Sequence, residues 1–156
     1  MLEATGRFAE AEPLMCRSLA IDDATFGNEH PSVAIRLSNL AELYRATNRL
    51  AEAEPLMGRA LAIREVTLGE DHPDTAIALN NLASLLQDTN RLAEAEPLMR
   101  RAVNILLKFG RDSGHQHPNF LASLNNYASL RMAMGDTQAQ AKEKALALLT
   151  PFGMSI

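Results

Sequence analysis

The chain has 156 residues and a formal net charge of −4, and its hydrophobic fraction of 47% is enough to bury a substantial core. This charge balance excludes a general binder of nucleic acid or anionic membranes, because both need dense Lys and Arg, although local basic patches are not excluded. No stretch approaches the roughly 20 apolar residues of a membrane helix. With an N-terminus unlike a signal peptide, these features predict a cytoplasmic location.

One ten-residue string is repeated along the chain. NRLAEAEPLM occupies residues 48–57 and recurs unchanged at 90–99, 42 positions later (90 minus 48), and the variant GRFAEAEPLM occupies residues 6–15. A fixed period of this length indicates an array of similar structural units, each of which buries its apolar face against its neighbours.

His-Pro dipeptides mark where the units begin. His30 and His72 are 42 positions apart, whereas His117 follows after 45, so the last unit is preceded by an insertion, which belongs in a loop. The predicted array covers residues 1–149, with a partial unit at 1–29, units at 30–71 and 72–116, a terminal unit at 117–149 and a tail at 150–156.

The N-terminal segment matches only part of a unit. Leu2 corresponds to Tyr44, so the chain is expected to begin with the last turn of one helix and to pass into a complete second helix from Arg7 to about Phe26. That helix lacks a partner on one side, and an apolar stripe left exposed in this way marks an interaction surface. We therefore expect either a homodimer or more repeats upstream, with the contact made by Phe8, Ala11, Leu14, Met15 and Leu19.

Each full unit reads as two amphipathic helices, because apolar residues recur at helical spacing on both sides of a short polar turn. Asn48 and Asn90 lie in these turns and are expected to cap the second helix with their side-chain oxygens. Gly27 and Gly69 are suited to end the second helices. The next helix starts at His-Pro, where proline fits the first helical turn. The helices of a pair are therefore antiparallel.

Proline and alanine have distinct roles in the predicted packing. Pro13, Pro55 and Pro97 lie inside the second helices, where each costs about 3 kcal/mol unless the helix relaxes, so we expect them to face away from the partner helix and to allow a bend. Ala83 and Ala95, like their counterparts one unit earlier, are expected to let the two backbones of a pair approach closely.

The order of large and small residues in a unit resembles the tetratricopeptide repeat, a family of helix-pair repeats. The 42-residue length, Leu-Asn-Asn-Leu-Ala at 79–83 and Gly-x-x-His-Pro at 69–73 are similar to the kinesin-light-chain type of this repeat. The resemblance implies an all-α, right-handed superhelical solenoid of antiparallel helix pairs that binds other proteins. The residues that follow the family pattern in order are Leu79, Leu82, Ala83, Leu86, Ala95, Met99 and Ala102.

Candidate chemistry is sparse. His30, His72 and His117 recur at helix-pair spacing, on the order of 10 Å apart, so they cannot share one metal ion and are expected to cap loops. Cys16 occupies a position that varies between copies, and no Ser or Cys combines with His and a carboxylate as a nucleophile requires. The Glu-x-Glu pairs of the string complement helix dipoles. We expect no catalytic residues, no metal and no cofactor, and hence no enzyme.

The resemblance places a binding groove on the first helix of each pair. An Asn side chain both donates and accepts hydrogen bonds, so a row of them can hold a peptide backbone, and the family pattern assigns this contact to Asn39, Asn81 and Asn126. Alternatively, these amides order the stack through helix–helix hydrogen bonds, or the chain is a structural spacer or self-assembly segment of a longer scaffold. The expected groove residues are Ser38, Asn39, Glu42, Arg45, Asn80, Asn81, Ser84, Gln87, Asn125, Asn126, Ser129 and Met132.

Overall fold

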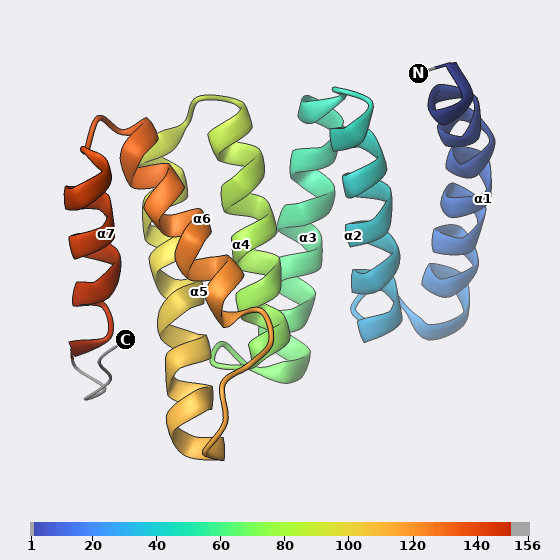
Figure 1. The fold of residues 1–156 in the computed structure, drawn as a ribbon. Coiled ribbons are helices and arrows are strands. Elements are labelled where there is room, and N and C mark those ends of the chain that lie inside the picture. The colour runs from blue at the N-terminus through green and yellow to red at the C-terminus, as the bar shows by residue number, and fades with distance from the viewer. Residues whose placement is uncertain (1, 151–156) are drawn as a thin grey trace. The chain divides into compact units, whose positions relative to one another are not determined.

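The computed structural model describes residues 2–150, with side chains described at residue 8 and from residue 10 onward, and this range contains only α-helices and turns. The chain divides into two compact units, residues 1–70 and 71–156. Beyond Thr150, the expected C-terminal tail lies outside the described residues. The first unit holds α1 (Leu2–Phe26), α2 (Pro31–Ala46) and α3 (Leu50–Leu68), and the second holds α4 (Pro73–Asp88), α5 (Leu92–Ser113), α6 (Phe120–Ala133) and α7 (Gln138–Ala147) (Figure 1).

Successive helices within a unit pack as antiparallel neighbours, as the short turns predicted. In the first unit α2 packs between its chain neighbours α1 and α3, and in the second α4 packs on α5, α5 on α6 and α6 on α7. We call α2, α4 and α6 the first helices, and α1, α3, α5 and α7 the second helices. The helix-pair organisation read from the repeat is therefore present in each unit.

The first helices begin at the His-Pro dipeptides. The Nδ1 atoms of His30 and His72 accept hydrogen bonds from the backbone N–H of Ser32 (3.2 Å) and Asp74 (3.1 Å), and proline follows as the first helical residue. His117 likewise accepts from the N–H two residues on, but α6 begins only at Phe120. Between His117 and α6, Pro118 and Asn119 form a turn.

The asparagines at the turns do not cap the second helices, and that expectation was wrong. Asn48 and Asn90 have φ of 59°, and α3 and α5 follow without a side-chain cap. The Asn48 N–H donates to the Arg45 carbonyl at 3.0 Å, and the Arg49 N–H donates to the Tyr44 carbonyl at 2.7 Å. This pattern closes the end of the preceding helix with a left-handed residue, a conformation that Asn tolerates better than most residues.

Helix α1 is one continuous helix, so the turn expected before Arg7 is absent. A separate single turn would have paid the nucleation cost of a new helix, whereas extension of an existing helix adds one hydrogen bond for each residue fixed. The expected end near Phe26 is confirmed, because Gly27 follows with φ of 87°. Gly69 ends α3 in the same way, with φ of 99°.

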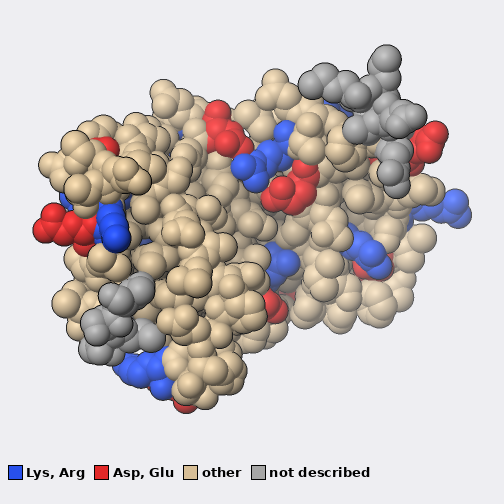
Figure 2. Space-filling model, in the orientation of Figure 1, with Lys and Arg blue, Asp and Glu red and all other residues tan. Residues whose placement is uncertain are grey.

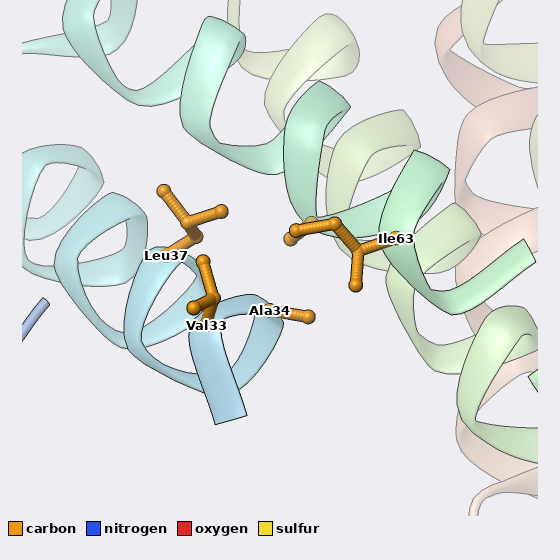
Figure 3. Close-up of a cluster of buried hydrophobic side chains, with 5 residues drawn as sticks. Val33, Ala34, Leu37 and Ile63 are labelled. Atoms are coloured by element: carbon orange, nitrogen blue, oxygen red, sulfur yellow. The ribbon is translucent and has the colours of Figure 1, made fainter. Parts of the chain in front are cut away.

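The apolar core of the first unit lies between α2 and α3. Figure 3 shows its central cluster, which consists of the buried side chains of Val33, Ala34, Leu37, Ala60 and Ile63. Leu19 of α1 and Leu56 of α3 are partly buried and pack against this cluster. Burial of these side chains supplies the main favourable term for the unit.

The small residues predicted at the helix contacts are fully buried. Ala41, Ala53, Ala83 and Ala95 each have no exposed surface, and they belong to the helix pairs α2–α3 and α4–α5. Side chains longer than alanine would hold the backbones farther apart, so these positions fix the close packing of each pair.

The prolines inside the second helices are exposed, as expected. Pro13, Pro55 and Pro97 all lie within continuous helices and face solvent. Each removes one backbone hydrogen bond at an exposed position, where water can reach the helix, and this lowers the cost. The bend expected at these prolines stays a prediction.

Candidate peptide-binding surfaces

The first helices of the second unit are joined by a pair of asparagines. The Nδ2 atom of Asn126 on α6 donates to Oδ1 of Asn80 on α4 at 3.2 Å. This is the helix–helix hydrogen bond that the sequence left open as an alternative to peptide binding. Asn126 therefore has a structural partner, whereas Asn81 on α4 and Asn125 on α6 form no side-chain hydrogen bond with a described residue.

In the first unit, two of the predicted sites form one pocket. A cavity of about 620 Å³ lies between α1 and α2, so that it brings groove candidates and self-association candidates together. Its lining is mainly apolar, with one amide and one carboxylate. The lining residues are Phe8, Ala11, Met15, Asn39, Glu42, Leu43 and Ala46.

The polar side chains beside this pocket differ in their availability. Asn39 reaches the surface and forms no side-chain hydrogen bond with a described residue. The Glu42 carboxylate lies 3.7 Å from the Arg45 guanidinium one helical turn away. Ser38 contributes to the packing of α2 on α3 instead, since its hydroxyl donates to the Ala34 carbonyl at 2.9 Å and accepts from Arg64 at 3.0 Å.

A smaller pocket of about 320 Å³ lies between α6 and α7. Asn125 is the only predicted groove residue in its lining, and Lys142 supplies the one charge there. Ser129 and Met132 lie elsewhere on α6, where Met132 is exposed, and Ser84 and Gln87 are half-buried on α4. The lining residues are Leu121, Leu124, Asn125, Ala128, Lys142, Ala145 and Leu146.

Sequence reasoning missed Arg49, which ties three elements of the first unit together. Its guanidinium donates to the carboxylates of Glu12 and Glu52, each at 2.7 Å, and lies 4.0 Å from the ring centroid of Tyr44. Burial raises the pKa of Tyr44, as do the neighbouring Cys16 and Glu12. The hydrogen bond from Arg49 lowers the pKa of Glu52. The recurring Arg-x-x-Glu of the string could have indicated this ion pair.

The predicted self-association residues are only partly exposed. Leu14 is 68% exposed, while Phe8, Ala11, Met15 and Leu19 are half-buried against α2. Ile21 was missed, although it is 54% exposed and lies seven residues after Leu14 on the same face of α1. Its counterpart 42 positions later, Ile63, is only 4% exposed. The face of α1 that carries Leu14 and Ile21 is therefore apolar and exposed, whereas Ile63 at the matching place on α3 is buried.

Charged residues of both signs are scattered over the face shown in Figure 2, and they form no broad basic area there. Among the described residues, no group of three or more His, Cys, Asp or Glu side chains is placed to hold a metal ion. Within the same range, no helix is long and apolar enough to cross a membrane.

Comparison with known proteins gives a family and a fold. The family model described as Tetratricopeptide repeat matches residues 1–65 and 37–108, which together span 1–108. A search of curated proteins found no match.

Three solved structures are similar to this chain along nearly its whole length. A Podosopora anserina protein described as a kinesin light chain with nearly identical TPR-like repeats is 29% identical, with a TM-score of 0.71 over 97% of this chain and 69% of that one. A variant of the same protein is 28% identical, with a TM-score of 0.73 over 98% and 72%. BtubC (BKLC) from P. vanneervenii, at 22% identity and a TM-score of 0.77 over 97% and 60%, shows the fold alone. The all-α class and the kinesin-light-chain-like repeat type are thereby confirmed.

Proposed function

Because the chain belongs to the tetratricopeptide repeat family, we propose that it is a protein-binding module that holds an extended segment of a partner protein on its first helices. Repeats of this family are generally protein–protein interaction modules. The observation that carries the finer proposal is the pair Asn39 and Asn81, at matching positions of α2 and α4. Both amides reach the surface and form no side-chain hydrogen bond with a described residue.

These amides fit a peptide backbone chemically. Each side chain offers a carbonyl acceptor and two N–H donors, so it can pair with both the N–H and the C=O of one extended residue. Such pairing does not depend on the peptide's side chains. The mainly apolar pocket beside Asn39 can hold one apolar side chain of the bound segment, which would supply specificity.

Mutagenesis separates binding from stacking. The double variant Asn39→Ala with Asn81→Ala removes the unengaged amides, whereas Asn80→Ala removes only the acceptor of Asn126. Partner proteins are first captured from the native cytoplasm, and the partner peptide that binds the chain is identified. The affinity of this peptide for the wild type and for each variant is then measured by isothermal titration calorimetry.

We expect the double variant to lose binding with an unchanged melting temperature. Asn80→Ala should lower the melting temperature and retain binding, because a half-buried donor loses its acceptor. A double variant that binds like the wild type contradicts the groove assignment. A chain that captures no partner favours the alternative, a structural spacer within a longer scaffold.

Self-association is a second candidate function, favoured by the exposure of Leu14 and Ile21 on α1. The two ends of the chain differ in character. The exposed residues of α7 are mostly polar or charged, and they include Lys142, Glu143 and Lys144. Among the described residues, the large exposed apolar side chains of α1 have no counterpart on α7, and this asymmetry favours a closed two-fold dimer over a head-to-tail filament.

Light scattering tests this dimer. Leu14→Glu with Ile21→Glu should convert a dimer to a monomer, while Ala139→Glu on the exposed surface of α7 should not. Phe8→Glu and Met15→Glu are less suited to this test, since both residues line the pocket against α2. A wild-type chain that stays monomeric at high concentration and binds no hydrophobic dye contradicts the dimer. If a chain extended by its upstream sequence no longer binds the dye, the apolar surface of α1 packs against further repeats instead.

A further inference from the structure

One stripe along α5 differs from the matching positions of α1 and α3. Because the strings at 48–57 and 90–99 are identical, α3 serves as an internal reference for α5. Directly after the string the two copies differ at most positions, and three of these differences, spaced by four residues, lie on one face of a helix. Gly58, Ala62 and Val66 of α3 are replaced by Arg100, Asn104 and Lys108 in α5.

The same positions in α1 are also small, namely Cys16, Ala20 and Ala24. The change to long polar side chains is therefore specific to α5. It also coincides with a feature of the structure, because the three changed residues line one cavity of about 700 Å³ in the second unit.

The cavity combines an apolar floor with basic side chains. Apolar groups come from α5 and from the end of α7, and the polar groups come almost entirely from α5. The lining residues are Asp71, Pro97, Arg100, Arg101, Asn104, Ile105, Lys108, Ala147 and Leu148. Three cations thus face one carboxylate, in a chain whose net charge is −4.

Two of the basic side chains, Arg100 and Lys108, lie at the surface, and each has one acidic neighbour. The Arg100 guanidinium lies 4.0 Å from the carboxylate of Glu96, at the limit of an ion pair, and Lys108 pairs with the exposed Asp71. Exposed pairs of this kind contribute about 0–1 kcal/mol each, so an incoming carboxylate can replace them at little cost.

We propose that this cavity binds an acidic peptide segment of a partner protein, in which an apolar side chain lies between carboxylates. The apolar side chain would bury against Ile105 and Leu148, and the carboxylates would accept hydrogen bonds from Arg100 and Lys108. The Asn104 amide can pair with the peptide backbone. None of these residues belongs to the groove on the first helices, so the site is independent of the proposed function.

The lining favours a peptide over the other anionic partners. It contains no aromatic side chain on which a nucleic-acid base could stack. It also runs along the side of α5 and not at the N-terminus of that helix, the end at which phosphate groups bind most readily. A nucleic acid or a lipid surface is therefore an outcome of the test rather than the proposal.

The test measures fluorescence anisotropy with a fluorescein-labelled peptide that has a central Leu between Asp and Glu residues. A matched peptide carries Asn and Gln in place of the acids. We expect the acidic peptide to bind the wild type, more weakly as salt is raised, and the matched peptide to bind hardly at all. Arg100→Ala with Lys108→Ala should weaken binding by about tenfold or more.

Controls separate the cavity from general electrostatics and from the groove. Arg17→Glu on α1 changes the net charge by the same amount as the double variant and should leave the affinity unchanged, as should Asn39→Ala with Asn81→Ala. Arg100→Gln with Lys108→Gln keeps the side-chain stems and should weaken binding as the alanine variant does, which excludes a loss of packing.

Three results would overturn the proposal. The first is equal binding of the acidic and the matched peptides. The second is equal weakening by Arg17→Glu and by the cavity variant. The third is displacement of the peptide by a single-stranded oligonucleotide or by phosphatidylserine vesicles, with affinities higher than the peptide's and dependent on Arg100 and Lys108.

Discussion

The substitution Ala83→Leu tests the close contact between the helices of a pair. Ala83 lies on α4 and has no exposed surface, and Ala95 on the partner helix α5 has none either. Met99 on α5 is also buried, at 1% exposure. A leucine at this position adds three carbon atoms where the protein interior is packed at the density of an organic crystal.

The expected cost follows from this lack of space. Overpacking of a filled site costs about 1–3 kcal/mol, because side chains leave their preferred rotamers and backbones move apart. A natural domain is stable by only about 5–15 kcal/mol, so this is a considerable share. For a unit of this size, each kcal/mol lowers the melting temperature by about 4–8 °C.

Circular dichroism during thermal and urea unfolding measures the effect. Ala93→Leu is the matched control, since Ala93 lies on α5 in the same pair but is exposed. We expect Ala83→Leu to lower the midpoint and Ala93→Leu to leave it within about 0.5 kcal/mol of the wild type. A melting curve of Ala83→Leu that matches the wild type would refute the reasoning about the close helix contact.

Three further predictions concern the caps, the terminal helix and cooperativity. His72→Ala should destabilise the chain by about 0.5–2 kcal/mol in urea unfolding, and His72→Asn should restore most of that loss, because Asn also accepts a backbone N–H. Hydrogen bonds from Arg131 and Lys144 lower the pKa of Asp136, so its contribution is present above its ordinary pKa and is lost as the pH falls through the lowered value. Asp136→Asn should therefore lower the melting temperature at neutral pH but not in strong acid, and an equal difference at both would contradict the ion pair. Heat or denaturant should unfold the repeats in one dominant transition, which two probes with separate midpoints would disprove.

Much of the fold follows from features that act locally. The His-Pro starts and the glycine ends depend on backbone preferences of single residues, and Gly27 and Gly69 adopt the positive φ that the sequence predicts. Ala83 and Ala95 were assigned to the contact from their place in the repeat, and both are buried. Periodicity is informative here because each copy of the repeat confirms the register of the next.

The misinterpretations arose where one residue has two local options. Asn48 is suited to both an N-cap and a left-handed helix end, and the choice depends on backbone hydrogen bonds that a sequence does not display. Leu2 was aligned with a first helix, but it is the first residue of α1, which runs unbroken to Phe26.

The candidate sites depend on the tertiary placement of side chains. The bond between Asn80 and Asn126 joins residues 46 positions apart, so no local pattern predicts which amides stay available. The pocket between α1 and α2 requires the packing angle of two helices. The cavity on α5 depends on the end of α7, where the repeat pattern is weakest.

The central claim is that unengaged asparagine side chains of the first helices hold a partner's backbone. Two-dimensional NMR of the side-chain amide groups tests it directly. Spectra are recorded before and after addition of the peptide that was mapped from the captured partner. The account predicts that the NH₂ resonances of Asn39 and Asn81 shift on binding, while that of Asn28, in the turn before α2, stays in place. A peptide that binds without shifting the resonances of Asn39 and Asn81 would contradict it.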